Sequence, residues 1–399
     1  MRLTLVNQFY APDISPTAQL AASLAEHRAE RGDRVTIVTG RAGYLEGLAA
    51  PATVRSGRGL RIKRVWTPDL GKSSRGRRVL GYLTFTIGAL LRLLLLPPQD
   101  VLVAMTTPPF VSVAAVAHKL LHPRTRVVLW SMDCYPDAAE RFGELRPGGV
   151  TSRALRALNR WTFRHLDLVV GLDGAMIDLL EGQYAPEVDP PRFAVVPNWE
   201  RRSLFASIDE TPVWPGYAEL DVGDRAVALY LGNTGVGHSF DTLLDAAALL
   251  QDEVLFLFVG GGARWSELGA TVERRGLRNV VLRSYVPKDE TPNVMAGADL
   301  AVITLDDRSL GVMSPSKLHA NLAAGLPVLY VGPAGSNVDE AITRHDVGCS
   351  VRIGDVDGVV AAVRSLRDDP LAAERARAAF EAAYSDDAAL PQLDRLLDA

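Results

Sequence analysis

Short runs of apolar residues alternate along this chain with longer stretches in which apolar residues recur every three or four positions. The short runs predict buried β-strands, and the longer stretches predict helices that pack on them. Regular alternation of the two is typical of a parallel α/β sheet. In the first half we expect strands at 3–7, 35–39, 61–65, 101–104, 126–130, 168–171 and 193–196, and helices at 17–31, 111–121 and 153–163.

The pattern weakens over 198–224, where Pro212 and Pro215 interrupt it, and then starts again. We interpret this stretch as a linker between two similar halves. A length of 399 residues also favours two domains, which we place at 1–200 and 201–384. In the second half we expect a helix at 240–250 and strands at 226–231, 254–259, 280–282, 300–303, 328–331 and 350–351.

The charge and the cysteine content of the chain limit which partners it could bind and in which cellular compartment it could work. The chain has 43 basic and 47 acidic residues, a formal net charge of −4, whereas nucleic-acid binding needs a basic footprint. Its two cysteines, Cys134 and Cys349, form no disulfide framework or metal-binding spacing, which favours a reducing compartment. The start MRLTLVNQFY lacks the apolar core of a signal peptide. We therefore expect a cytoplasmic protein that binds no nucleic acid.

The segment 72–96 combines a basic cluster with a long apolar run. Lys72, Arg75, Arg77 and Arg78 precede LGYLTFTIGALLRLLLL, which is about 17 residues long, the lower limit for spanning a bilayer. Arg92 within this run would be costly at the centre of a membrane. The pattern leaves three interpretations: a helix buried on the sheet, a helix lying in the interface of an anionic membrane, or a spanning helix.

A glycine-rich turn follows the first predicted strand of the second half. Gly232, Asn233 and Gly235 form it, and His238 comes shortly after. Glycines let a phosphate approach the backbone, and the following helix start favours anions. A strand-to-helix turn also needs glycine for its own geometry, so the pattern fits either a phosphate site or a plain turn. His238 is a possible donor to an anion, or a core residue.

The stretch Ser314-Pro315-Ser316-Lys317 leads into another predicted helix. Ser314 or Ser316 is suited to cap this helix, and Pro315 suits its start. A lysine in the first turn opposes the helix dipole, and a bound diphosphate would remove that conflict. The alternative is a lysine that faces solvent. We interpret Lys317 as a diphosphate ligand.

Polar residues follow three predicted strands of the first half. Tyr10 comes after the first strand, Thr106 and Thr107 after the fourth, and Asp133 after the fifth. Open α/β sheets bind ligands at the carboxyl ends of their strands, so these residues are candidates to contact an acceptor or only to shape turns. Asp133 could accept a hydrogen bond from a sugar or assist removal of an acceptor proton. We find no P-loop, nucleophile elbow or metal-ligand spacing, and we expect no metal or other cofactor.

Six stretches, in order, resemble the retaining glycosyltransferases of family 4, above all bacterial members that build capsule, O-antigen and exopolysaccharide. They are LVNQFYAPD, MTTPPF, LWSMDCYPD, VVPNW, LYLGNTGVGHSFDTLL and SLGVMSPSKLHANLAAGLPVLYVGPAGS. The resemblance implies an α/β protein of the GT-B fold, with two Rossmann-like doubly wound domains facing an interdomain cleft. The second domain would hold a nucleoside diphosphate sugar, with a UDP-sugar favoured. The first would receive a glycan acceptor, often linked to polyprenyl diphosphate, at the inner face of the plasma membrane. A helix at 385–399 would pack back on the first domain.

The same resemblance assigns roles residue by residue. Gly232, Asn233 and Gly235 match the family's glycine turn, Ser316 and Lys317 match its phosphate-facing Pro-Ser-Lys, and Asp133 matches the aspartate at the mouth of the acceptor domain. We expect these residues to bind the donor and to place the acceptor, with Lys317 and Asp133 acting in catalysis. From their places in the chain alone, His238 and Ser314 are added as candidates for donor binding, and Tyr10, Thr106 and Thr107 as candidates for acceptor binding.

The chain departs from the family pattern at several positions, and two of these departures remove carboxylates beside the donor helix. Many members carry two glutamates eight positions apart, and Val312 and Ala320 occupy those positions here. The second glutamate commonly holds ribose hydroxyls, so the donor is left open. Two alternatives follow: a nucleotide-sugar 2-epimerase of the same fold, or a non-catalytic scaffold of a polysaccharide assembly complex, which the missing carboxylates favour.

Overall fold

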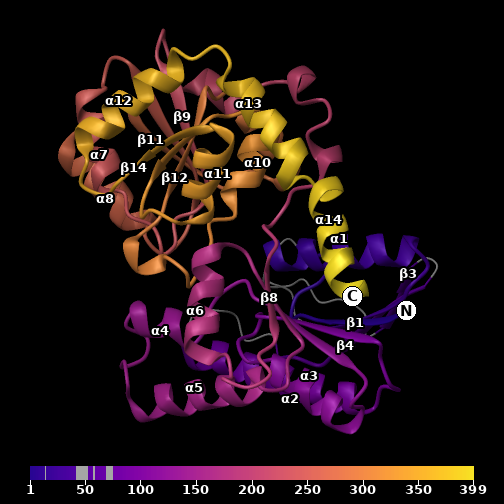
Figure 1. Cartoon of the computed structure of the whole chain (residues 1–399). Helices are drawn as coiled ribbons and strands as arrows, with labels where there is room; N and C mark the ends of the chain where they lie inside the picture. Colours follow the sequence, from indigo (N-terminus) through magenta and orange to yellow (C-terminus); the bar gives the residue numbers. More distant parts are fainter. Residues whose placement is uncertain (14, 42–52, 57–58, 69–74) are drawn as a thin grey trace. The chain divides into compact units, whose positions relative to one another are not determined.

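The computed structural model describes residues 1–13, 15–41, 53–56, 59–68 and 75–399 (Figure 1). Contacts divide it into two compact units. The first comprises Met1–Val196 with Gly311–Met313 and Gln392–Ala399, and the second comprises Pro197–Leu310 with Ser314–Pro391. Lys72 and the two residues after it, part of the predicted basic cluster, lie outside the described residues.

The described part of the first unit contains an eight-stranded sheet in the order β3-β4-β2-β1-β5-β6-β7-β8, antiparallel at β3–β4 and parallel elsewhere. Its strands are β1 (Arg2–Val6), β2 (Arg34–Gly40), β3 (Thr53–Ser56), β4 (Leu60–Val65), β5 (Val101–Met105), β6 (Arg126–Trp130), β7 (Leu168–Gly171) and β8 (Arg192–Val195). Its helices are α1 (Pro16–Glu30), α2 (Arg75–Leu94), α3 (Ser112–Leu121), α4 (Asp137–Arg141), α5 (Val150–Phe163) and α6 (Gly174–Tyr184). All five residues of β5 are buried, as expected for a central parallel strand covered on both faces.

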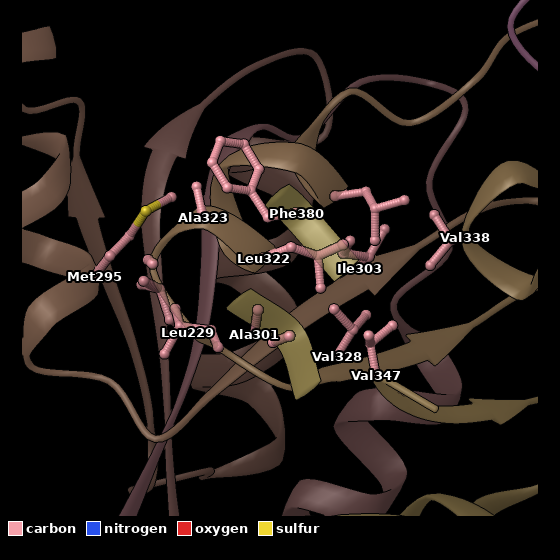
Figure 2. Close-up of a cluster of buried hydrophobic side chains, with 14 of the residues drawn as sticks. Leu229, Met295, Ala301, Ile303, Leu322, Ala323, Val328, Val338, Val347 and Phe380 are labelled. Carbon is pink, nitrogen blue, oxygen red and sulfur yellow. The ribbon is translucent and has the colours of Figure 1, made fainter. Parts of the chain in front are cut away.

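The second unit contains a six-stranded parallel sheet in the order β11-β10-β9-β12-β13-β14. Its strands are β9 (Ala226–Asn233), β10 (Val254–Gly261), β11 (Val280–Ser284), β12 (Leu300–Thr304), β13 (Val328–Val331) and β14 (Gly348–Val351). The helices that follow β9 in sequence are α7 (Asp241–Leu249), α8 (Trp265–Arg275), α9 (Thr291–Ala296), α10 (Lys317–Ala323), α11 (Asn337–His345), α12 (Val356–Arg367), α13 (Ala372–Ala379) and α14 (Asp386–Asp398). One face of the sheet forms a core in which Leu229, Ile303 and Val328 meet Leu322 and Phe380 (Figure 2).

The segment 198–224 is not a linker, and that prediction was wrong. It forms three short 3-10 helices, at Arg202–Leu204, Ile208–Glu210 and Pro215–Glu219, and Phe205 and Ile208 are buried in the core of the second unit. Such turns lack the 3.6-residue period that identifies an α-helix in a sequence, and this is why the pattern seemed to weaken.

Ion pairs fasten the final turns of α14, which belong to the first unit, to α1. Arg28 is almost fully buried and pairs with Asp33, Asp394 and Asp398, each at 2.6 Å. Arg126 adds a hydrogen bond from Nη1 to the carbonyl oxygen of Leu397 at 2.9 Å. A buried guanidinium needs such partners, so these contacts hold the end of the chain in place.

The helix α2 contains most of the apolar run that the sequence left open to three interpretations. Phe85, Ala89 and Leu93 are fully buried, as expected for a helix packed on a sheet. Among the residues that the structure describes, no helix combines the length and apolar content that crossing a bilayer requires.

Candidate functional site

The ammonium group of Lys317 lies at the carboxyl end of β9. Its Nζ donates hydrogen bonds to the Asn233 carbonyl oxygen at 3.2 Å and to His238 Nε2 at 3.4 Å. It also lies 4.8 Å from the centroid of the Tyr230 ring, a cation–π contact. A Cβ atom at Gly232 would lie 3.4 Å from Lys317 Cε, so the glycine leaves room beside the lysine. The structure thus joins the two stretches that the sequence singled out separately.

His238 is oriented by the carbonyl oxygen of Thr304, which lies 2.7 Å from Nδ1. Because a carbonyl oxygen only accepts, Nδ1 must carry the hydrogen and Nε2 must offer its lone pair to Lys317. Burial, and then the charge of Lys317, lower the pKa of His238 to about 3, so the ring is neutral at physiological pH. In this arrangement His238 positions Lys317, a role that neither interpretation of the sequence, a donor to an anion or a core residue, included.

Lys317 is a partly buried cation, and within the described part of the chain it has no anionic partner. Burial lowers the pKa of its ammonium group to about 8. Within the described part of the chain, no carboxylate forms an ion pair with it, and its hydrogen-bond acceptors are the neutral groups of Asn233 and His238. Withdrawing an ammonium group from water without a counter-ion is unfavourable, so this site favours an anionic ligand.

Glycines at the end of β10 shape the loop beside Lys317. Gly262 has a φ of 131°, and a Cβ atom there would collide with the side-chain oxygen of Asn233. The neighbouring backbone is held by a hydrogen bond from Thr234 N to the Gly261 carbonyl oxygen at 2.7 Å. Arg264 follows these glycines and donates from Nη1 to the His238 carbonyl oxygen at 2.6 Å. The sequence analysis missed Arg264, although its place directly after a glycine run at a strand end was a usable signal.

The two serines before Lys317 do not cap α10, and that prediction was wrong. Ser316 occupies the N-cap position, but its side chain makes no capping hydrogen bond. Its backbone is helical, with φ −82° and ψ −5°, whereas a capping serine is normally extended so that its oxygen reaches the free N–H groups. The Oγ of Ser314 is buried and has no partner among the described residues. Both hydroxyls therefore stay candidates for contact with a ligand.

The candidate residues of the first unit gather at the carboxyl ends of β1, β5 and β6, which are neighbours in the sheet. The Thr106 hydroxyl oxygen accepts hydrogen bonds from Met132 N at 2.9 Å and Asp133 N at 3.2 Å. The Thr107 carbonyl oxygen accepts one from Gln8 N at 2.7 Å. Thr106 therefore orients the loop that carries Asp133, and Thr107 ties two strand ends together.

Asp133 lies at this edge with a perturbed carboxyl group. Burial raises its pKa to about 6, so the group is ionised at neutral pH but close to its titration range, as suits a general base. Tyr10 is 3% exposed, and the side-chain oxygens of Asn7 and Gln8 are buried without partners in the described structure. Such unsatisfied acceptors at a strand edge could receive sugar hydroxyl groups.

At the two positions where many family members carry glutamates, 312 and 320, this protein has apolar residues that belong to the packed interior. Val312 is fully buried, and Ala320 packs against the core of the second unit. Among the described residues, no three His, Cys, Asp or Glu side chains are grouped as a metal site requires.

The chain matches two family models. Residues 17–199 match a glycosyl transferase 4-like domain, and residues 225–369 match glycosyl transferases group 1. The probable glycosyltransferase WbjE of Pseudomonas aeruginosa is 26% identical over 236 residues, which cover 55% of this chain and 54% of that protein. The putative colanic acid biosynthesis glycosyl transferase WcaI of Escherichia coli K12 is 25% identical over 245 residues, covering 60% of this chain and 59% of that protein. The chain therefore spans little more than half the length of these relatives.

Solved structures match the fold of this protein over its whole length. HepE of Anabaena in complex with UDP has a TM-score of 0.67 and 16% sequence identity, with 100% of both chains covered. At this identity the likeness concerns the fold alone. Two open sheets with flanking helices, one parallel and one parallel except at β3–β4, are the architecture of that fold. The chain therefore has the GT-B fold and matches glycosyl transferase domains in both halves, which supports a glycosyltransferase of the family 4 type.

Proposed function

We propose that this protein transfers a sugar from a nucleoside diphosphate sugar to a hydroxyl group of a lipid-linked glycan, in the assembly of a cell-surface polysaccharide. The observation that carries the proposal is the partly buried Lys317 ammonium group, which has no carboxylate partner in the described structure and lies against a glycine turn. A diphosphate supplies the missing negative charge. HepE was solved with UDP and with UDP-glucose, which supports a UDP-sugar as donor.

The relatives support the biological setting. The name of WcaI refers to the biosynthesis of colanic acid, and WbjE is described as a glycosyltransferase. We infer a glycan acceptor linked to polyprenyl diphosphate and a place of action at the cytoplasmic face of the plasma membrane.

Transfer breaks the bond between the anomeric carbon and the diphosphate oxygen and forms a bond from that carbon to the acceptor oxygen. Negative charge grows on the leaving diphosphate, and Lys317, positioned by His238, stabilises it. Asp133 orients the acceptor hydroxyl group, and its carboxylate is able to receive the proton. We propose retention of the anomeric configuration and no metal or other cofactor.

The test is release of nucleoside diphosphate from a panel of UDP-, GDP- and dTDP-sugars, with and without a bacterial lipid extract. Lys317→Met removes the charge and keeps an unbranched side chain of similar length. Lys288→Met is the matched control, because Lys288 is the other lysine of the second unit. We expect release from one donor class, raised by the extract, lost in Lys317→Met and retained in Lys288→Met.

Other outcomes would identify the alternatives. An epimerised nucleotide sugar, formed without an acceptor, would point to the 2-epimerase. Donor binding without turnover under every condition, extract included, would point to a non-catalytic scaffold. Equal activity of Lys317→Met and the wild type would overturn the role of Lys317.

A further inference from the structure

The outward face of α2 is apolar, although it faces solvent. The helix packs beside α3 (Figure 1). The side chains of Phe85, Ala89 and Leu93 are fully buried. A helix that is buried on one side normally presents polar residues on the other. From Leu80 onward the exposed positions recur every three or four residues and are aliphatic, between 52% and 79% exposed: Leu80, Leu83, Ile87, Leu91 and, one residue after the helix end, Leu95. We call these five residues the apolar stripe. It extends about 22 Å along the helix axis.

A basic recess lies where this helix ends. It has a volume of about 650 Å³ and is lined by Leu96 and Pro97, which follow α2, and by the cations Arg2, Arg34, Arg61 and Lys63. None of the residues that line the recess is acidic. The charges also act on one another, because burial, Arg92 and Arg61 all lower the pKa of Lys63.

The carboxylates nearest in sequence do not neutralise the recess. Asp33 is paired with Arg28 and the amino group of Met1, and Asp100 accepts a hydrogen bond from the backbone N–H of Arg2. At the other end of α2, the first turn carries Arg77 and Arg78, of which Arg78 lies 3.8 Å from Glu144. The apolar stripe therefore runs between two groups of basic residues.

Such a surface complements an anionic bilayer. Aliphatic side chains enter the boundary between headgroups and acyl chains, while arginine and lysine contact lipid phosphates. We propose that the first unit docks on an anionic phospholipid bilayer, with α2 lying flat in the interface through the apolar stripe and lipid phosphates held in the basic recess. This docking surface rests on the proposed function, because a lipid-linked acceptor is the reason for the protein to work at a membrane.

The direction of α2 relates this surface to the acceptor site. The helix connects the carboxyl end of β4 to the amino end of β5, so it spans the height of the sheet. Its start lies close to the Asp133 loop, since Arg78 and Tyr82 both act on the ionisation of Tyr135. A bilayer along the apolar stripe would therefore reach the edge of the sheet where Asp133 lies, and a lipid-linked glycan could enter there from the membrane surface.

The experiment measures flotation of the full chain with vesicles of phosphatidylcholine alone and of equal parts phosphatidylcholine and phosphatidylglycerol. The stripe variant is Leu83→Gln, Ile87→Gln and Leu91→Gln, and the charge variant is Arg61→Gln and Lys63→Gln. Matched controls in the second unit are Leu204→Gln, Leu249→Gln and Leu371→Gln, at leucines 47% to 60% exposed, and Arg274→Gln with Arg278→Gln.

We expect the wild type to bind the anionic vesicles more tightly than the neutral ones. The charge variant should lose about fivefold per charge removed, about 25-fold in total, on anionic vesicles only. The stripe variant should lose about 100-fold, since each half-exposed leucine is worth about fivefold when buried. Both controls should bind like the wild type.

The proposal is overturned if the wild type does not bind anionic vesicles, or if the stripe variant binds as well as its control. Binding of UDP, measured without vesicles, separates this failure from that of the proposed function. A protein that binds UDP but no vesicles refutes the docking surface alone. A protein that binds vesicles but no nucleotide refutes the donor site alone.

Discussion

The affinity for UDP should depend on the charge of Lys317, and we develop this prediction first. Burial lowers the pKa of Lys317 from 10.5 to about 8, which corresponds to about 3 kcal/mol against the charged form. A diphosphate restores a counter-ion, and a charge pair at about 4 Å is worth about 4 kcal/mol at an effective dielectric constant of about 20. We therefore expect Lys317→Met to weaken UDP binding by about 2–4 kcal/mol, or about 30- to 1,000-fold.

The same argument predicts how affinity changes with pH. The charged form binds, and in the free protein it is lost as the pH rises through about 8. UDP affinity of the wild type should thus fall about tenfold between about pH 7 and about pH 9, because only about a tenth of the molecules stay charged. His238 does not titrate in this window, since its pKa is lowered to about 3.

Titration calorimetry with UDP at several pH values measures both effects, and uridine serves as the ligand without phosphates. Lys317→Met should show weak UDP affinity that no longer changes over this range, and uridine binding should be the same in both proteins. A wild-type affinity that stays flat with pH, or a variant that follows the wild-type curve, would refute the assignment of Lys317 to the diphosphate.

Three further predictions test other parts of the molecule. Asp133→Asn should lower kcat about 100-fold or more while UDP affinity is kept. The kcat of the wild type should fall as the pH drops below about 6, where the Asp133 carboxylate is protonated. A variant whose kcat follows the same pH profile as the wild type would contradict this role. Arg28→Ala should cost about 3–5 kcal/mol of unfolding free energy in urea, because it removes the buried cation that Asp33, Asp394 and Asp398 share. Arg31→Ala, at a half-exposed partner of the same Asp394, should cost less than about 1 kcal/mol. Burial raises the pKa of Asp394, but hydrogen bonds from His27 and Arg28 outweigh this and leave it lowered, so the stabilisation should be present above about pH 4 and be lost as the pH falls further. Gly262→Ala should displace Asn233 and weaken UDP binding, whereas Gly276→Ala, also at positive φ but with open space around it, should lower only the melting temperature.

The sequence by itself determined the type and order of most elements. Strands such as β5 and β10 are continuous apolar runs, because a parallel strand covered on both faces has no polar side, and this signal is local. The candidate residues at strand ends could also be predicted from the sequence. In a parallel sheet all strands run in one direction, so their carboxyl ends and the loops that follow lie at the same edge. The short strand β3 was not predicted, and the 3-10 turns of 198–224 were missed because their period is not that of an α-helix.

Only the tertiary structure decided which groups meet and which faces stay exposed. Lys317 and Asn233 are 84 positions apart, and the fold of the second unit brings them into hydrogen-bond contact. The orientation of His238 depends on a carbonyl group of another strand, which no local pattern encodes. In α2 the apolar residues that follow Arg78 fall on every side of the helix, so periodicity could not say which side faces inward. The packing of Phe85, Ala89 and Leu93 decided this, and thereby left the apolar stripe on the outside.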